Sequence, residues 1–257
     1  INLILVDKEL HLYFAPLTLT RPVGALRMGI MTIANSWKLA LQKHTEIGDI
    51  EYKTESYLYD VWNEATSNGL HIAGNVKPTA ALVAEVAQLQ PHQALYVNGQ
   101  WIASHGIAET EKKEVQLNEE DLIVVTRPWH LFQNNGKALL ADFELITAGR
   151  TTQQLSASNQ VIGNHPVFLE EGAKVECAIL NTTNGPIYIG KDAEVMEGSV
   201  IRGPFALCDH AVVKMSAKMY GDSTIGPYCK VGGEVTNSIF QAYSNKGHDG
   251  FVGNSII

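Results

Sequence analysis

The chain has 257 residues, of which 45% are hydrophobic, and it carries a formal net charge of −8. This length allows one large domain or two ordinary ones, with enough apolar material for a buried core. The acidic balance argues against nucleic acid and anionic membranes as partners, and no run of eighteen apolar residues is present to span a bilayer.

Residues 1–126 are predicted to form a small α/β domain, because strand and helix patterns alternate along them. The first six residues read as a strand rather than a signal peptide, since they lack a basic head and soon give way to polar residues. Apolar residues at helical spacing predict helices over 26–42 and 80–90. The further predicted strands are 94–97 and 101–103, joined by a turn at Asn98-Gly99, and 122–126.

Residues 127–160 are predicted to connect this domain to the next. Trp129, Phe132, Leu139 and Phe143 are spaced like the buried stripe of a helix, and the polar segment 151–160 is typical of a linker.

Residues 161–257 are predicted to form a parallel β-helix. A bulky aliphatic residue recurs every six positions, at Ile189, Val195, Ile201, Leu207, Val213, Met219, Ile225 and Val231. At 45% hydrophobic content, eight such matches would arise by chance about two times in a thousand. A period of six fits neither a lone helix nor a half-buried strand, but it fits coils that each add a short strand to several flat faces. The less favoured alternative is an ordinary all-β sandwich.

The repeat is predicted to break after Val235. Residues 237–250 are too polar for a coil wall, so we expect an inserted loop there, and functional residues concentrate on loops held by rigid scaffolds. The chain stops at Ile257 on a bulky repeat position without a polar cap, so we expect the native chain to continue beyond it.

The polar break contains the first group of candidate functional residues. His248 has the chemistry of a general base at neutral pH, and Lys246 beside it can hold a phosphate or carboxylate. The alternative is a solvated loop with an incidental histidine. In the first domain, Arg21 and Arg27 can meet a phosphate, although pairing with carboxylates of their own domain is as good an interpretation.

Cysteines and histidines indicate neither a disulfide framework nor a metal site. Cys177, Cys208 and Cys229 form no Cys-x-x-Cys pair, which predicts free thiols in the reducing cytoplasm. No ligand spacing such as His-x-x-x-His is present, so no structural metal is expected.

Hexads followed by a histidine in a polar break resemble the left-handed β-helix acyltransferases. Gly247-His-Asp-Gly-Phe-Val-Gly-Asn-Ser255 is similar to the segment Asn-His-Leu-Thr-Tyr-Leu-Gly-Asp-Ala of the bifunctional glucosamine-1-phosphate acetyltransferase/N-acetylglucosamine-1-phosphate uridyltransferases. The resemblance implies a left-handed β-helix, a homotrimer, acetyl-coenzyme A as acyl donor, and His248 as the base. It implies substrate contacts for its neighbours Tyr243, Asn245 and Lys246.

The first domain resembles the same family. Pro16-Leu-Thr-Leu-Thr-Arg-Pro22 is similar to the Pro-Leu-Thr-x-x-Arg-Pro-Lys segment of sugar-phosphate nucleotidyltransferases, and places Arg21 in the substrate site. Pro128-Trp-His-Leu-Phe132 is similar to the Pro-Trp-Asp-Leu-Leu segment that joins the domains of related enzymes. The chain is most similar to the GlmU-related sugar nucleotidyltransferases of bacteria.

Departures from the family pattern are found in both domains. The Gly-x-Gly-Thr-Arg phosphate loop has no match between Val6 and Pro16, and the substrate lysine is Val23. We therefore expect a degenerate, reduced nucleotidyltransferase-like domain. In the β-helix the phosphate-binding lysine is Thr236, and Arg202 is the nearest substitute for the family's arginine.

Three functional hypotheses follow. The first is acetyl transfer from acetyl-coenzyme A to an amino sugar phosphate such as glucosamine 1-phosphate. The second is Mg²⁺-dependent nucleotidyl transfer that makes a nucleotide-sugar from a nucleoside triphosphate and a sugar 1-phosphate. The third is a scaffold that binds sugar nucleotides without turnover.

Overall fold

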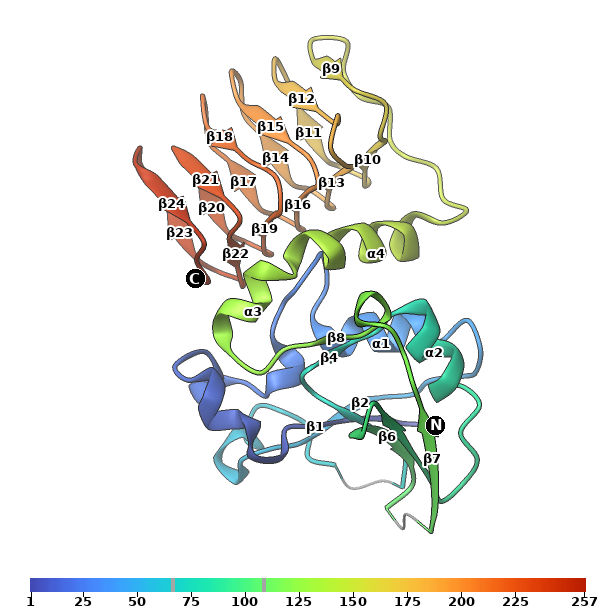
Figure 1. The fold of residues 1–257 in the computed structure, drawn as a ribbon. Coiled ribbons are helices and arrows are strands. Elements are labelled where there is room, and N and C mark those ends of the chain that lie inside the picture. Colours follow the sequence, from blue (N-terminus) through green and yellow to red (C-terminus); the bar gives the residue numbers. More distant parts are fainter. Residues whose placement is uncertain (66–67, 108–109) are drawn as a thin grey trace. The chain divides into compact units, whose positions relative to one another are not determined.

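A computed structural model describes residues 1–65, 68–107 and 110–257 (Figure 1). The chain divides into two compact units. The first comprises Ile1–Leu26 with Met31–Pro128, and the second comprises Arg27–Ile30 with Trp129–Ile257. The segment that the sequence sets apart as a connector, 127–160, therefore belongs almost wholly to the second unit.

The first unit is built on a mixed sheet with the strand order β2-β1-β3-β6-β5-β7 in its described part. Strand β1 runs parallel to β2 and β3, whereas β6 is antiparallel to β3 and β5. The bounds are β1 Leu3–Val6, β2 Ile50–Lys53, β3 Leu70–Ala73, β5 Gln93–Val97, β6 Gln100–His105 and β7 Glu111–Val115. A separate pair is formed by β4 Val76–Lys77 and β8 Ile123–Val124.

The helices of the first unit are α1 Ile33–Leu41 and α2 Ala80–Val86, with short 3-10 turns at Lys8–Phe14, Leu17–Thr20, Val23–Ala25, Ser56–Leu58 and Glu119–Asp121. The predicted hairpin is confirmed, because Asn98 and Gly99 take the left-handed conformation that a tight turn needs (φ 51° and 80°). Strands β2, β3, β4 and β7 were not predicted. The charged sequence of β7 is largely exposed and shows no apolar alternation.

The helix predicted over 26–42 is wrong at its beginning. Helix α1 begins only at Ile33, where the hydroxyl of Thr32 caps it by accepting a hydrogen bond from the Asn35 amide at 3.2 Å. The segment Arg27–Ile30 packs within the second unit instead.

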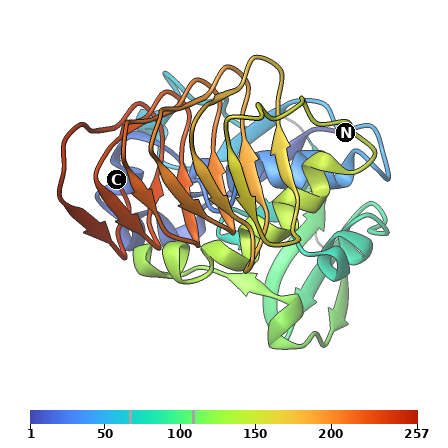
Figure 2. The ribbon, with the colours of Figure 1, turned by 90° about the horizontal axis from the view of Figure 1, so that it is seen from above.

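The second unit contains a left-handed parallel β-helix with three flat faces (Figures 1 and 2). The first face has the order β10-β13-β16-β19-β22, with bounds Val167–Leu169, Ile187–Ile189, Phe205–Leu207, Ser223–Ile225 and Ile239–Phe240. The second face has the order β11-β14-β17-β20-β23, with bounds Lys174–Val175, Glu194–Val195, Val212–Val213, Lys230–Val231 and Asn245–Lys246. The third face has the order β9-β12-β15-β18-β21-β24, with bounds Gln160–Ile162, Ile179–Asn181, Val200–Arg202, Lys218–Met219, Glu234–Thr236 and Phe251–Gly253.

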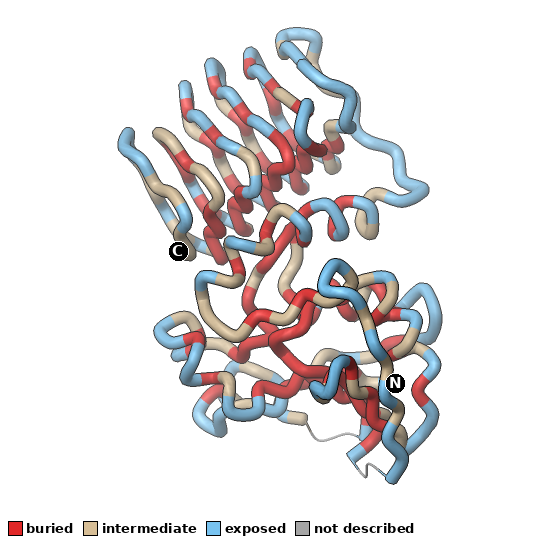
Figure 3. The backbone as a smooth tube through the Cα atoms, in the orientation of Figure 1, coloured by how far each residue is buried: buried red, intermediate tan, exposed pale blue. Residues whose placement is uncertain are grey.

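The predicted hexads form the interior of this prism. Each bulky position stacks on its equivalent in the next coil, as in Ile189, Leu207 and Ile225, and all eight are buried. Figure 3 shows this burial along the inner side of the coils. Burying one such aliphatic side chain contributes about 1.5–3 kcal/mol, so the repeat itself supplies the driving force for stacking.

Helices α3 Pro128–Gln133 and α4 Asn135–Thr147 follow the first unit in sequence. From α4, Leu139 and Phe143 pack against Phe168 and Tyr188 on the outer side of the first face. The predicted buried stripe is therefore correct for these two residues but wrong for Trp129, which is 49% exposed.

The predicted position of the repeat break is also wrong. Val235 pairs with Met219, which places it at a bulky position only four residues after Val231. The break therefore precedes Val235, and residues 237–250 form no inserted loop. They contain β22 and β23, which continue the stack.

Candidate active site

His248 lies in the turn between β23 and β24, residues 247–250, which we call the histidine turn. Its side chain is exposed at the corner between the second and third faces. Two lysines fix the backbone around it. The Lys246 ammonium donates to the carbonyl oxygen of His248 at 2.9 Å, and the Lys214 ammonium donates to that of Gly247 at 2.9 Å.

Lys214 can reach this turn because the intervening coil is shortened. Four residues separate β17 from β18 and β23 from β24, whereas only Gly232 and Gly233 separate β20 from β21. The Lys214 chain passes beside Gly232, where a Cβ would lie 3.5 Å from its Cβ and Cδ atoms. The missing residues thus open a path between coils that are not direct neighbours.

Lys246 does not present a free ammonium to a substrate. It occupies the register position that Val213 and Val231 occupy in the coils beneath it. Its ammonium also donates to the carbonyl oxygen of Gly232 at 2.8 Å, in addition to that of His248. The structure therefore gives Lys246 a role in holding the histidine turn, and its predicted phosphate contact stays a prediction.

Tyr243 belongs to an aromatic column at the corner between the first and second faces. Its ring stacks on Tyr228 at 4.9 Å between centroids, and Tyr228 stacks on His210 at 4.7 Å. All three residues have positive φ, so the same corner geometry repeats in successive coils. Asn245 is exposed on β23, in the same coil as His248.

The other two predicted site residues lie elsewhere. Arg202 ends β15, three strands from β24 in the third face, which separates it from the histidine turn by about 14 Å along the stack alone. Arg21 belongs to the first unit. Its predicted partner Arg27 belongs to the second unit, where its guanidinium donates to the carbonyl oxygens of Gln241 and Ile30. The predicted Arg21–Arg27 phosphate site therefore stays a prediction.

A cavity in the first unit lies where β1 and β3 end. It has a volume of about 490 Å³ and is lined by residues including Lys8, Ala73, Asn75 and Trp101. The chain passes from β1 to β2 on one side and then to β3 on the other, and ligands of open α/β sheets bind at such a switch point. The Lys8 ammonium lies 3.7 Å from the centre of the Trp101 ring.

The cavity lining includes one acid, Glu9, and the neighbouring carboxylate of Asp7 is hydrogen-bonded within the protein. Burial raises the pKa of the Asp7 carboxyl, against the opposing effect of hydrogen bonds from Thr54 and Val23 and of the nearby His11 imidazole. The Val23 amide lies 3.0 Å and the Thr54 hydroxyl 2.5 Å from its oxygens. Throughout the described residues, no three His, Cys, Asp or Glu side chains are grouped as metal ligands.

Comparison with known families identifies the chain at a coarse level. A family model described as sugar nucleotidyl transferase matches residues 3–151, which is more than half of the chain. The chain belongs to the sugar nucleotidyl transferase family. None of the curated proteins compared with it matches. Of the helices that the structure describes, none is both long and apolar enough to cross a membrane.

The family match ends before β9, the first strand of the β-helix, so it covers the switch-point cavity but not His248. Sequence reasoning missed Lys214 as a support of the histidine turn. The spacing of four between Val231 and Val235 could have indicated it, because a shortened turn leaves room for a side chain from the preceding coil.

Proposed function

We propose that this member of the sugar nucleotidyl transferase family transfers an acetyl group from acetyl-coenzyme A to the amine of an amino sugar phosphate. The observation that carries the proposal is an exposed imidazole, His248, on a turn held by two lysine ammonium groups from different coils. A general base needs a fixed position because a displacement of about 1 Å can cost a hundredfold in rate.

The proposed reaction uses this imidazole as the base. The sugar amine attacks the thioester carbonyl carbon, and His248 removes a proton from the nitrogen. The new C–N bond forms as the C–S bond breaks, and coenzyme A leaves as a thiol after taking up a proton. Imidazole can take and return a proton near neutral pH, so one group serves both transfers. Lys214 and Lys246 act on the position of the base and not on the reacting atoms.

Release of free thiol tests this proposal. The full chain is incubated with acetyl-coenzyme A and a panel of amino sugar phosphates, including glucosamine 1-phosphate. We expect His248→Ala to abolish thiol release while folding and assembly persist. His165→Ala is the matched control, since His165 is another exposed histidine of the second unit. Unchanged release in His248→Ala would remove this residue from the mechanism.

A second candidate function concerns the first unit. The switch-point cavity, with Lys8 stacked on Trp101, favours binding of a nucleotide or nucleotide-sugar there. Because the phosphate loop has no match between Val6 and Pro16 and the substrate lysine is Val23, we favour binding without nucleotidyl transfer as the form of this candidate. A nucleotide-sugar should raise the melting temperature without pyrophosphate release, and Lys8→Gln should abolish the increase while Lys43→Gln leaves it unchanged. Pyrophosphate release that depends on Lys8 would instead support transfer.

We further propose a homotrimer that works in the cytoplasm. A flat-sided prism can close around a threefold axis. The cysteines Cys177, Cys208 and Cys229 are free, and burial raises the pKa of the Cys208 thiol to about 11, which keeps it protonated. Light scattering on the full chain tests the trimer, and a monomeric mass would contradict it.

A further inference from the structure

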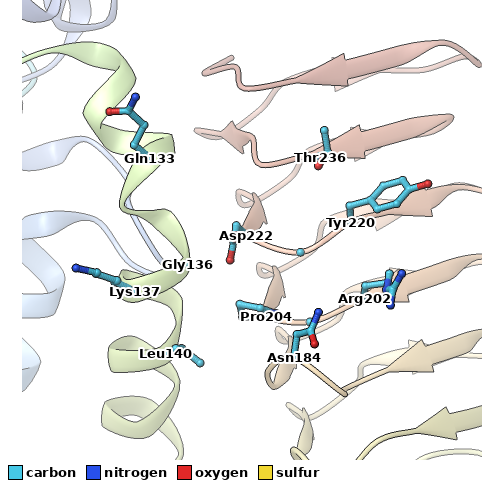
Figure 4. A pocket seen from close by; sticks show the side chains of 12 residues that line it. Gln133, Gly136, Lys137, Leu140, Asn184, Arg202, Pro204, Tyr220, Asp222 and Thr236 are labelled. Carbon is cyan, nitrogen blue, oxygen red and sulfur yellow. The ribbon is translucent and has the colours of Figure 1, made fainter.

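A groove in the second unit lies between α4 and the third face, away from the histidine turn. Its volume is about 660 Å³, within the range of small-molecule sites. One wall carries Arg202 and Tyr220 from the third face, and the other is formed by α4, including Gly136. Figure 4 shows the two walls facing each other, with Asp222 at the corner between them.

The stacking register brings a positive and a negative group into this groove. Residues 200 and 201 pair with 218 and 219, so Arg202 and Tyr220 are neighbours about 5 Å apart along the stack. Asp222 follows Tyr220 by two residues, which puts it on the order of 8 Å from Arg202 along the backbone grid. A phosphorylated monosaccharide is long enough to contact both.

The Asp222 carboxylate reaches the first turn of α4 because position 136 is glycine. A Cβ at Gly136 would lie 2.3 Å from Oδ1 of Asp222, closer than any stable contact. Burial in the groove raises the pKa of the Asp222 carboxyl. Within the described parts of the chain this carboxylate accepts no hydrogen bond, although the Asp222 backbone carbonyl accepts one from Asn135 at 2.8 Å.

Hydrogen bonding distinguishes Arg202 from three other basic residues of the second unit. Lys214 and Lys246 each donate to backbone carbonyls, and Arg150 forms a two-pronged ion pair with Glu170. Among the residues that the structure describes, the Arg202 guanidinium has no hydrogen-bond or ion-pair partner. Lys137 of α4 also lines the groove, but Figure 4 shows its ammonium pointing away from the strands that carry Arg202.

We propose that this groove is a second ligand site, which binds a sugar phosphate. The Arg202 guanidinium binds the phosphate, for which its planar fork of donors is suited. The Asp222 carboxylate accepts hydrogen bonds from sugar hydroxyls or an amine, and the Tyr220 ring packs against the apolar face of the sugar. The site lies at the opposite end of the third-face strands from His248, and it does not require acetyl transfer.

Binding to the full chain tests the proposal directly. Glucosamine 1-phosphate, glucosamine and inorganic phosphate are titrated separately by calorimetry. The variants are Arg202→Gln, Asp222→Asn and Gly136→Ala, with Lys218→Gln as a matched control on the same face. Gly136→Ala should keep or improve helix stability while its methyl group displaces the carboxylate. His248→Ala separates this groove from the histidine turn.

We expect glucosamine 1-phosphate to bind more tightly than either fragment. Arg202→Gln, Asp222→Asn and Gly136→Ala should each weaken it about tenfold or more, with Lys218→Gln unchanged, and the same three losses should appear when the variants are made in a His248→Ala background. Absence of binding, or binding lost only in His248→Ala, would overturn the proposal. Equal affinity for inorganic phosphate without dependence on Asp222 would likewise reduce the groove to a simple anion site.

Discussion

Of two adjacent glycines in the shortened coil, only one should be sensitive to substitution by alanine. Gly233 has φ +71°, and a Cβ there would lie 2.6 Å from the Gly250 carbonyl oxygen and 2.8 Å from the Lys246 ammonium. Gly232 has no positive φ, and its Cβ would make ordinary contacts of 3.5 Å with Lys214 and 3.7 Å with the Gly247 carbonyl oxygen. Gly233→Ala should therefore disturb the histidine turn, whereas Gly232→Ala should not.

The expected loss of stability in Gly233→Ala has two parts. A non-glycine residue in the left-handed region costs about 1–2 kcal/mol. Ser216 adopts φ 58° in the coil beneath, so this corner tolerates that conformation by itself. The contact with the Gly250 carbonyl adds a second cost, because a backbone group cannot rotate away. Together the two costs lower the free energy of unfolding of Gly233→Ala by about 3 kcal/mol. Such a loss lowers the melting temperature of the unit by roughly 10 °C.

Calorimetry on both variants measures the loss of stability. The NMR resonance of the His248 ring reports whether the histidine turn is disturbed. Gly198→Ala is a further control, because Gly198 has φ +74° but its Cβ would come closest to the side-chain hydroxyl of Ser216, at 3.2 Å, and would stay 3.8 Å from the backbone. We expect a loss of about 1–2 kcal/mol there and no shift of the His248 resonance. Equal melting temperatures for Gly233→Ala and Gly232→Ala would refute the reasoning.

Three further substitutions probe the second unit. Lys214→Met should cost about 1–3 kcal/mol in urea denaturation and shift the His248 ring resonance, because a charge-assisted hydrogen bond is lost; an unmoved resonance would contradict its positioning role. Asn135→Ala should cost about 2–4 kcal/mol, since this buried amide bonds three partners, and a loss below 0.5 kcal/mol would be inconsistent with them. Burial raises the pKa of Glu170, but hydrogen bonds from Arg150 and Tyr188 outweigh it and leave the pKa lowered. The stabilisation, under about 1 kcal/mol for this partly exposed pair, is present above pH 4.5 and lost as the pH falls below it. The stability difference between wild type and Glu170→Gln should shrink over that range, and a constant difference would contradict it.

Much of the β-helix could be predicted from sequence because its repeat is a local property. Each coil places one bulky side chain inside each face, so a spacing of six identifies Ile201 and Leu207 as core without knowledge of their neighbours. The prediction was wrong where the spacing changed, at Val235. There the sequence alone did not distinguish a shortened turn from the beginning of a loop.

The candidate site was less predictable because its contacts join residues from different coils. His248 was identified from its local segment, and the structure places it exposed on a turn. The role of Lys246 depends on the carbonyls of two turns, and Arg202 resembles a partner of His248 in sequence while lying three strands away. In the first unit, sequence similarity gave the family, but only the order of the strands located the cavity.

The sequence by itself determined the prism, its inward-facing residues and the identity of the exposed histidine, because side-chain alternation and six-residue spacing are set along the chain. Tertiary structure decided which groups surround that histidine. Lys214 and Gly247 are 33 residues apart, and Arg27 and Gln241 are 214 apart. Such pairs meet only because coils of defined length stack in one register, and a change of two residues in one turn decides which ammonium group reaches which carbonyl.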